Sequence, residues 1–171
     1  MQDADRSSSE ATVVARPPKE CSSDELAAFV KIAAKGNEVE ADDIKRGVER
    51  AAIVAWFESK SSMHAVAALK MPYDSYKERV FRKAGIPEES QKFGLELGYV
   101  YVEEAKRGNG YGAALVKRII ETSDKSPVYA TTRSDNDAMQ AILRKNGFAS
   151  VGSAYTSERN PSQSLMLFAR L

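Results

Sequence analysis

A glycine-rich segment constrains this chain more than any other, because it joins an apolar strand-like run to an apolar helix-like run. A basic residue, Arg107, is followed by glycines at three alternate positions, 108, 110 and 112. Glycine allows tight turns and lets a bulky anion approach main-chain N–H groups. The start of a helix adds unpaired N–H donors and the positive end of the helix dipole. The segment therefore predicts a phosphate-binding loop between a strand over Leu95–Val102 and a helix over Ala113–Glu121.

Other glycine-rich loops that bind nucleotides fit this segment less well. A P-loop requires Lys and then Ser or Thr after its last glycine, whereas two alanines follow Gly112. A dinucleotide-binding fingerprint is satisfied in relaxed form by Gly108, Gly110 and Ala113. That fold needs further βα units and an acidic residue at the end of the next strand, where this chain has Thr131-Thr132-Arg133. A dinucleotide fold and a glycine turn without a ligand both stay open at this point.

Bulk composition limits the class of protein. Of the 171 residues, 43% are apolar, which is enough for one domain with a core of ordinary size. The formal net charge of +1 argues against a generally basic nucleic-acid binder. No apolar run approaches the roughly 20 residues of a membrane span, and the polar N-terminus lacks the apolar centre of a signal peptide. The single cysteine permits no intramolecular disulfide and the single histidine no Cys/His cluster, so we expect a cytoplasmic protein without a metal.

Apolar periodicity divides the chain into strands and helices. Residues 1–10 are rich in Ser and charge and predict a disordered tail, so the folded domain is expected over residues 11–171. Strands are predicted over Ala11–Arg16, Ala51–Phe57, His64–Lys70, Leu95–Val102, Val128–Thr132, Phe148–Thr156 and Ser164–Arg170. Helices are predicted from a cap at Ser22 or Ser23 to Gly36, and over Ala41–Arg50, Tyr73–Ala84, Ala113–Glu121 and Asp135–Lys145, the last capped by Asp135. This order predicts an α+β fold with a mixed sheet, in which the strands flanking Ala113–Glu121 are parallel neighbours.

Two motifs, in this order along the chain, resemble the GCN5-related N-acetyltransferase (GNAT) superfamily. The first is a strand ending in Val102 and followed by Arg107-Gly108-Asn109-Gly110-Tyr111-Gly112, and the second is a helix opened by Asn136 and closed by Gly147-Phe148. The resemblance covers residues 51–171 and, by order of elements alone, residues 11–50. It implies a single-domain α+β fold with a mixed, mostly antiparallel β-sheet, helices on both faces and a central V-shaped splay between the fourth and fifth core strands. The segment at about 71–94 departs from the family, which usually has a short turn there. It is expected to be a helical insertion that packs on the surface or covers the acceptor site.

The resemblance also implies acetyl-CoA as co-substrate. In such enzymes the loop N–H groups hold the pyrophosphate, as amides at a helix start bind anions generally. The residues implicated by position are Arg107, Gly108, Asn109, Gly110, Tyr111, Gly112 and Ala113. The strand before the loop is expected to bulge, so that backbone groups of Tyr101 and Val102 bind the pantetheine arm. Asn136 would contact the cofactor arm unless it serves only as a helix cap, and Glu103 and Glu104 are expected to be solvated.

For catalysis, the resemblance implies attack of an amine on the thioester. Glu96 lies on the strand before the loop, where related enzymes carry a glutamate base, and its apolar sequence neighbours would strengthen it as a base. Many family members place a tyrosine seven residues after the Asn to protonate the leaving thiolate, but this chain has Leu143 there. Tyr155 or Tyr101 would serve as the acid instead, or the thiolate leaves without one.

The predicted function is transfer of an acetyl group from acetyl-CoA to a primary amine by direct attack in a ternary complex. The acceptor is expected to be a small-molecule amine or an amine of a protein or peptide, with no membrane or nucleic-acid partner, and a homodimer is left open. Two alternatives stand. Leu143 in place of tyrosine favours a non-catalytic module that binds acyl-CoA. A toxin-like acetyltransferase of aminoacyl-tRNA fits the chain length, but the near-neutral charge argues against it.

Overall fold

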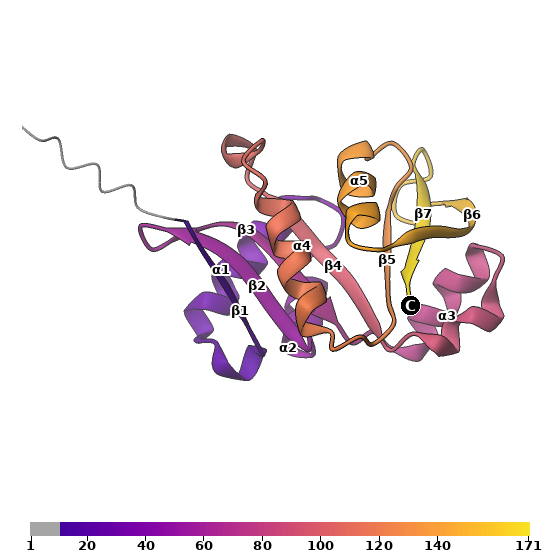
Figure 1. Ribbon diagram of the computed structural model, residues 1–171, viewed down its shortest axis with the longest axis horizontal. Coiled ribbons are helices and arrows are strands. Elements are labelled where there is room, and N and C mark those ends of the chain that lie inside the picture. The colour runs from indigo at the N-terminus through magenta and orange to yellow at the C-terminus, as the bar shows by residue number, and fades with distance from the viewer. Residues whose placement is uncertain (1–10) are drawn as a thin grey trace, which may run out of the picture.

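Seven strands form one sheet in the computed structural model, which describes residues 11–171 (Figure 1). The strands are β1 (Thr12–Arg16), β2 (Ile53–Ser59), β3 (Ser62–Lys70), β4 (Leu95–Val102), β5 (Val128–Arg133), β6 (Ala149–Thr156) and β7 (Ser164–Arg170). The α-helices are α1 (Ser23–Ala34), α2 (Ala41–Glu49), α3 (Asp74–Lys83), α4 (Tyr111–Thr122) and α5 (Asp137–Lys145), and short 3-10 helices cover Pro18–Glu20, Pro87–Lys92 and Glu104–Lys106. The predicted order of strands and α-helices is confirmed, while the predicted tail at residues 1–10 lies outside the described residues. Within the described part of the chain, no helix is long and apolar enough to cross a membrane.

The sheet consists of two halves that meet at β4 and β5. Its order is β1-β2-β3-β4-β5-β7-β6, and β4 with β5 is the one parallel pair among the described strands. That pairing is limited to Leu95 with Val128 and Glu96 with Tyr129. Beyond these residues the two strands separate, as Figure 1 shows. The predicted fold class, with its V-shaped splay between the fourth and fifth strands, is therefore confirmed.

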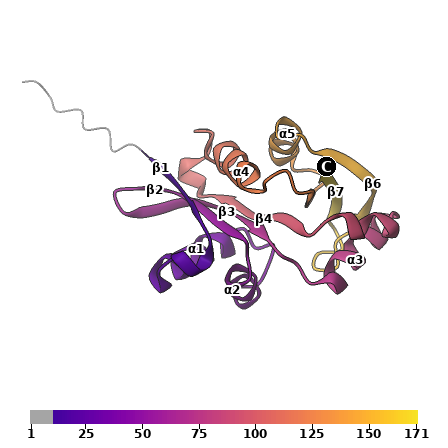
Figure 2. The same cartoon turned by 60° about the horizontal axis from the view of Figure 1, so that its bottom comes forward.

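Helices cover both faces of the sheet (Figure 2). On one face, α4 and α5 pack over a core in which Leu143 is fully buried. On the other face, α1 and α2 cover the first half of the sheet, around fully buried Phe29 and Trp56. The helix α3 continues this second layer over β5 and β7, with Phe81 edge-on to Tyr129 at 5.2 Å between ring centroids. Fully burying one such apolar side chain contributes about 1.5–3 kcal/mol, so α3 is anchored by its own part of the core.

The bulge expected next to the glycine loop lies earlier in β4 than predicted. Gly98 pairs with Ala68 of β3, and Tyr101 pairs with Val66. Two residues of β4 lie between these pairs but only one residue of β3, which defines a β-bulge. Tyr99 adopts the left-handed region there, with φ 55°. Tyr101 and Val102 are already back in register, so the bulge precedes them.

Side-chain caps fix two of the helix starts. At α1, the Ser22 hydroxyl accepts from the Glu25 amide and the Glu25 carboxylate accepts from the Ser22 amide, which confirms the predicted cap. At α5 the cap is Asn136, whose Oδ1 accepts from the Met139 amide at 3.0 Å. The predicted cap Asp135 is therefore wrong by one residue. Both residue types cap helices equally well, so the sequence did not distinguish them.

Candidate active site

A cleft of about 1300 Å³ opens where β4 and β5 separate. Its lining extends from the glycine loop to α3 and includes the connection between α1 and α2 and the loop between β6 and β7. The predicted site residues in this lining are Glu96, Tyr101, Val102, Arg107, Gly108, Gly110, Tyr111, Gly112, Ala113, Asn136 and Tyr155. Asn109 is the one predicted site residue that does not line the cleft. The fold thus brings predicted residues from β4, the glycine loop, α5 and β6 into one cavity.

Backbone amides dominate the loop end of the cleft. Gly108 and Gly110 have φ values of 82° and 76°, in the left-handed region that glycine adopts without strain. No described atom outside the neighbouring residues lies within 4 Å of a Cβ built on either glycine. The first backbone bond of α4 joins the Ala114 amide to the Gly110 carbonyl at 3.0 Å, so the amides of residues 111–113 precede the helical ladder. With the helix dipole, these donors favour an anion in the open space beside the glycines.

Two side chains hold the loop from within. Asn109 Nδ2 donates to the Lys106 carbonyl at 2.9 Å, which closes the loop and explains why its side chain does not reach the cleft. Arg107 Nε donates to the Val102 carbonyl at 3.2 Å. The Arg107 guanidinium also lies over the Tyr101 ring, 5.5 Å from its centroid. The basic side chain of the motif therefore fixes the end of β4.

A carboxylate ties the loop to α1. Glu103 pairs with Lys35 at 2.7 Å and lies 3.5 Å from the His64 ring. The hydrogen bond from Lys35 is the main reason why the pKa of Glu103 is lower than usual. The Glu103 side chain is 27% exposed, so it is partly solvated as predicted, although its ion pair was not foreseen because the partners are distant in sequence. Glu104 is exposed, as predicted.

Asn136 stands at the start of α5 and lines the cleft. Its Oδ1 is occupied by the helix cap described above, which confirms the cap hypothesis. A side-chain amide carries donors as well as an acceptor, so capping does not use up Asn136. Its contact with a cofactor stays a prediction.

Glu96 lies at the floor of the cleft among polar side chains rather than apolar ones. The Glu96 side chain is 4% exposed, and Lys70 Nζ lies 3.2 Å from Oε2. The hydroxyls of Tyr76 and Tyr129 donate to it at 3.4 and 3.3 Å. The expected apolar setting is wrong because successive residues of a strand point to opposite faces, so sequence neighbours do not surround the carboxylate. We call Lys70, Tyr76, Glu96, Tyr129 and Tyr155 the floor cluster.

Burial and the Glu96 carboxylate shift the pKa values of the lysine and the three tyrosines of the floor cluster. Repulsion from Glu96, followed by burial, raises the pKa of Tyr76 well above its usual value. Burial, followed by Glu96, raises the pKa of Tyr129 strongly and that of Tyr155 to about 12. Burial, the largest single effect, would lower the pKa of Lys70, but attraction and hydrogen bonding to Glu96 and Tyr99 together outweigh it, so the pKa is raised overall. At neutral pH the cluster therefore holds an ammonium and three protonated phenols.

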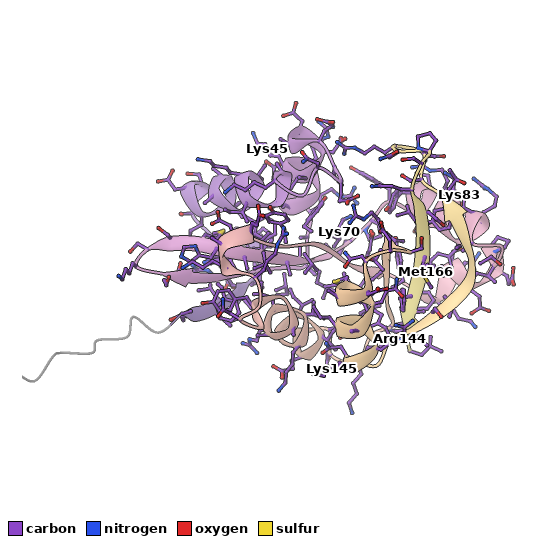
Figure 3. The ribbon with its side chains drawn as sticks, turned by 90° about the horizontal axis from the view of Figure 1, so that it is seen from above. Lys45, Lys70, Lys83, Arg144, Lys145 and Met166 are labelled. Atoms are coloured by element: carbon purple, nitrogen blue, oxygen red, sulfur yellow. The ribbon has the colours of Figure 1, made fainter. Side chains whose placement is uncertain are left out.

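Lys70 and Tyr129 were not predicted as site residues from the sequence, and Tyr76 was predicted only as part of a helix that covers the acceptor site. No motif marks them, since each comes from a different element. Lys70 could have been found from strand pairing, because antiparallel pairing of β3 with β4 makes it the cross-strand partner of Glu96. Figure 3 shows Lys70 at the centre of the molecule, whereas Lys83 of α3 lies towards its rim.

Leu143, which replaces the family tyrosine, is fully buried in the core between α5 and the sheet. It offers no proton to the cleft. Tyr155 of β6 lines the cleft and interacts electrostatically with Glu96, whereas the Tyr101 ring packs 3.3 Å from a Cβ position on Gly36. Of the two tyrosines considered as acids, Tyr155 is the one that joins the floor cluster.

Comparison with protein families gives the chain its class. Residues 54–148 match the model described as the acetyltransferase (GNAT) family. The chain belongs to the GNAT family. Because this is a family of acetyltransferase enzymes, membership favours an enzyme over a non-catalytic binding module. Over 60 residues the chain is 35% identical to N-alpha-acetyltransferase RimI of Mycobacterium tuberculosis, a match that spans 35% of this chain and 38% of that relative.

Solved structures of GNAT type share the whole architecture. ElaA of Escherichia coli superposes with a TM-score of 0.70 at 19% identity, covering 95% of this chain and 100% of that one. An acyl-CoA N-acyltransferase from Pseudomonas aeruginosa superposes with a TM-score of 0.68 at 15% identity, covering 95% of this chain and 100% of that one. The ribosomal-protein-S18-alanine N-acetyltransferase of Escherichia coli superposes with a TM-score of 0.65 at 15% identity, covering 94% of this chain and 93% of that one. At these identities the likeness establishes the fold alone.

Proposed function

We propose that this GNAT protein transfers an acetyl group from acetyl-CoA to a primary amine by direct attack in a ternary complex. One observation carries the proposal: a single cleft joins an amide-rich helix start at one end to a buried carboxylate at the other. The first end suits the phosphates of a donor and the second suits a cationic amine. We call these ends the donor half and the acceptor half.

In the donor half, the amides of residues 107–113 would hold the pyrophosphate. The open space at Gly108 and Gly110 supports this assignment, because a bulky anion can approach the backbone there. The edge of β4 that faces β5 has no paired residue after Glu96. The Val102 carbonyl accepts from Arg107, so the remaining backbone groups near Tyr101 and Val102 would bind the pantetheine arm. Asn136 would add a side-chain contact to this arm.

In the acceptor half, Glu96 would take a proton from the acceptor ammonium, directly or through a water molecule. Acetyl-CoA supplies the thioester carbonyl carbon that the neutral amine attacks. A C–N bond forms, the C–S bond breaks and the electron pair of that bond leaves with sulfur. The second proton of the amine passes to the thiolate, so the products are an amide, coenzyme A and protonated Glu96.

Tyr155 would assist departure of the thiolate by donating a hydrogen bond. Its pKa of about 12 keeps the hydroxyl protonated, although it also makes the phenol a weak acid. An ordinary thiol has a pKa of about 8.5, so the thiolate is a good leaving group without complete proton transfer. This accounts for an enzyme with Leu143 in place of the family tyrosine.

The acceptor class has two sources of support. The partial match to an N-alpha-acetyltransferase favours an amine of a peptide or protein. The acceptor half, however, is crossed by the loop between β6 and β7, which favours a small amine. Arg159 of this loop pairs with Glu40 before α2 at 2.8 Å, and the adjacent Glu158 pairs with Lys83 of α3.

Turnover and binding measured together test the function. Purified protein is titrated with acetyl-CoA by calorimetry and then incubated with acetyl-CoA and a panel of amino acids, polyamines and peptides, with products identified by mass spectrometry. We expect binding and an acetylated amine, with initial-rate patterns that intersect as they do for a ternary complex. Binding without any acetylated product would contradict the transfer, and parallel initial-rate patterns would contradict direct attack.

A further inference from the structure

The floor cluster contains a cation that the proposed transfer does not use. Lys70 lies at the end of β3, with its side chain 17% exposed, and pairs with Glu96, which is 4% exposed. Removing two charges from water is costly, and their mutual attraction often fails to offset this cost. A buried pair at the floor of a cleft is therefore weak evidence for stability, and it requires another explanation.

The surroundings of Lys70 are built to hold the ammonium in place. Lys70 and Glu96 are cross-strand partners, so both side chains leave the sheet on the same face. A Cβ on Gly98 would lie 2.6 Å from Lys70 Cδ, so only glycine leaves the path of the lysine free. The ammonium then lies 4.6 Å from the Tyr99 ring centroid and 5.6 Å from that of Tyr76. Such contacts with ring faces stabilise a cation in a desolvated site.

The pair presents both signs of charge to an acceptor. A simple ammonium entering this floor would be attracted by Glu96 and repelled by Lys70, which lie only 3.2 Å apart, so the two effects largely cancel. The further arginines of the cleft lining, Arg79 and Arg133, pair with carboxylates of their own, so they do not neutralise Glu96 or replace Lys70 in its pair. An amine that also carries a carboxylate would satisfy both members of the pair.

We propose that the acceptor is an amino-acid-like zwitterion whose carboxylate binds Lys70 and whose ammonium binds Glu96. This inference rests on the proposed acetyl transfer and names its substrate class. It favours a free amino acid or related small molecule over a lysine side chain of a protein. The loop between β6 and β7, tied to both sides of the acceptor half, agrees with a small acceptor.

Matched acceptors test the proposal. The free amino acids that give product are each compared with their α-amides, which keep the amine but lack the carboxylate. We expect kcat/KM of the wild-type enzyme to be at least about tenfold higher for the acid, as one charge-assisted hydrogen bond implies. In Lys70→Gln the kcat/KM values for the acid and its amide should become about equal, mainly because the value for the acid falls. Equal values for acid and amide in the wild type would overturn the proposal.

Two further variants complete the test. Lys117→Gln makes the same change at an exposed residue of α4 outside the cleft lining, and should keep the preference for the acid. Gly98→Ala displaces Lys70 without removing its charge, and should reduce the preference even if Lys70→Gln does not fold. A preference that survives in folded Lys70→Gln or Gly98→Ala would refute the role of Lys70.

Failure of this inference can be told apart from failure of the proposed function. If acetyl-CoA binds and peptides or polyamines are acetylated without preference for a carboxylate, the transfer stands and the zwitterionic acceptor is refuted. If no amine of the panel is acetylated, the transfer and the acceptor assignment are refuted together. Calorimetry with acetyl-CoA alone gives the readout of the donor half in both cases.

Discussion

The donor and acceptor halves of the cleft are built in different ways. The donor half consists of consecutive residues, 107–113, and presents main-chain amides at the start of α4. The acceptor half consists of side chains from β3, α3, β4, β5 and β6, which meet around the carboxylate of Glu96. A backbone site depends on conformation, whereas a side-chain site depends on the identity of every residue in it. The two halves should therefore respond differently to mutation.

The largest effect is expected in the acceptor half, from Glu96→Gln. The amide keeps the shape of the side chain but cannot accept the proton of the amine, so kcat should fall by roughly 100- to 1000-fold. Affinity for acetyl-CoA should stay unchanged, because Glu96 is at the opposite end of the cleft from the glycine loop. Steady-state kinetics and calorimetry measure the two quantities.

Glu104→Gln is the matched control, since it makes the same change at an exposed residue beside the donor half. Its kcat should equal that of the wild type. A Glu96→Gln enzyme with full rate at neutral pH would assign the base to another group. A parallel loss of acetyl-CoA affinity would show that the two halves are not separate.

A smaller effect, confined to the donor half, is expected from Gly110→Asp. Asp and Asn both tolerate the left-handed backbone at this position, but only Asp places an anion beside the phosphates. At an effective dielectric constant of 20, two unit charges 4 Å apart repel by about 4 kcal/mol. Because solvent and salt screen part of this repulsion, we expect a roughly 100-fold loss of acetyl-CoA affinity. Gly110→Asn should lose much less. Equal affinities of the two variants would contradict anion binding by this loop.

The same contrast explains what the sequence predicted well. Three alternate glycines after Arg107 specify a conformation through local chemistry, and the structure places Gly108 and Gly110 in the left-handed region as that pattern requires. The parallel pairing of β4 and β5 followed from strand order and the right-handed crossover. Both features depend on residues that are close together in the chain.

The acceptor half was predicted poorly because its contacts are long-range. Tyr76 lies 20 residues from Glu96 and Tyr129 lies 33 residues from it. Their meeting depends on how α3 packs over β5, which no local pattern encodes. The position of the bulge at Tyr99 depends similarly on pairing with β3. The residues next to Glu96 in the sequence predicted the strand that carries it, but not the face of the sheet to which its side chain points.

A modest effect is expected from Tyr155→Phe. Loss of one hydrogen bond to the departing sulfur should lower kcat by about three- to tenfold, with acetyl-CoA affinity unchanged. Because the pKa of Tyr155 is raised to about 12, its hydroxyl stays protonated as pH increases to its usual pKa near 10 and beyond. The pH profile of kcat should therefore show no descending limb from this group below about pH 10. A descending limb in that range that disappears in Tyr155→Phe would contradict the shift.

The smallest effect is expected at the rim of the acceptor half, from Arg159→Gln. The pair of Arg159 with Glu40 is solvent-accessible, with side chains 42% and 78% exposed, so its loss should change the free energy of unfolding by less than about 1 kcal/mol. Arg118→Gln is the control, because it removes a similar exposed pair with Glu121 on α4, away from the cleft. Only Arg159→Gln should alter the acceptor KM, by about two- to threefold, and added salt should reduce the difference from the wild type. A changed affinity for acetyl-CoA in Arg159→Gln would mean that the loop between β6 and β7 also shapes the donor half.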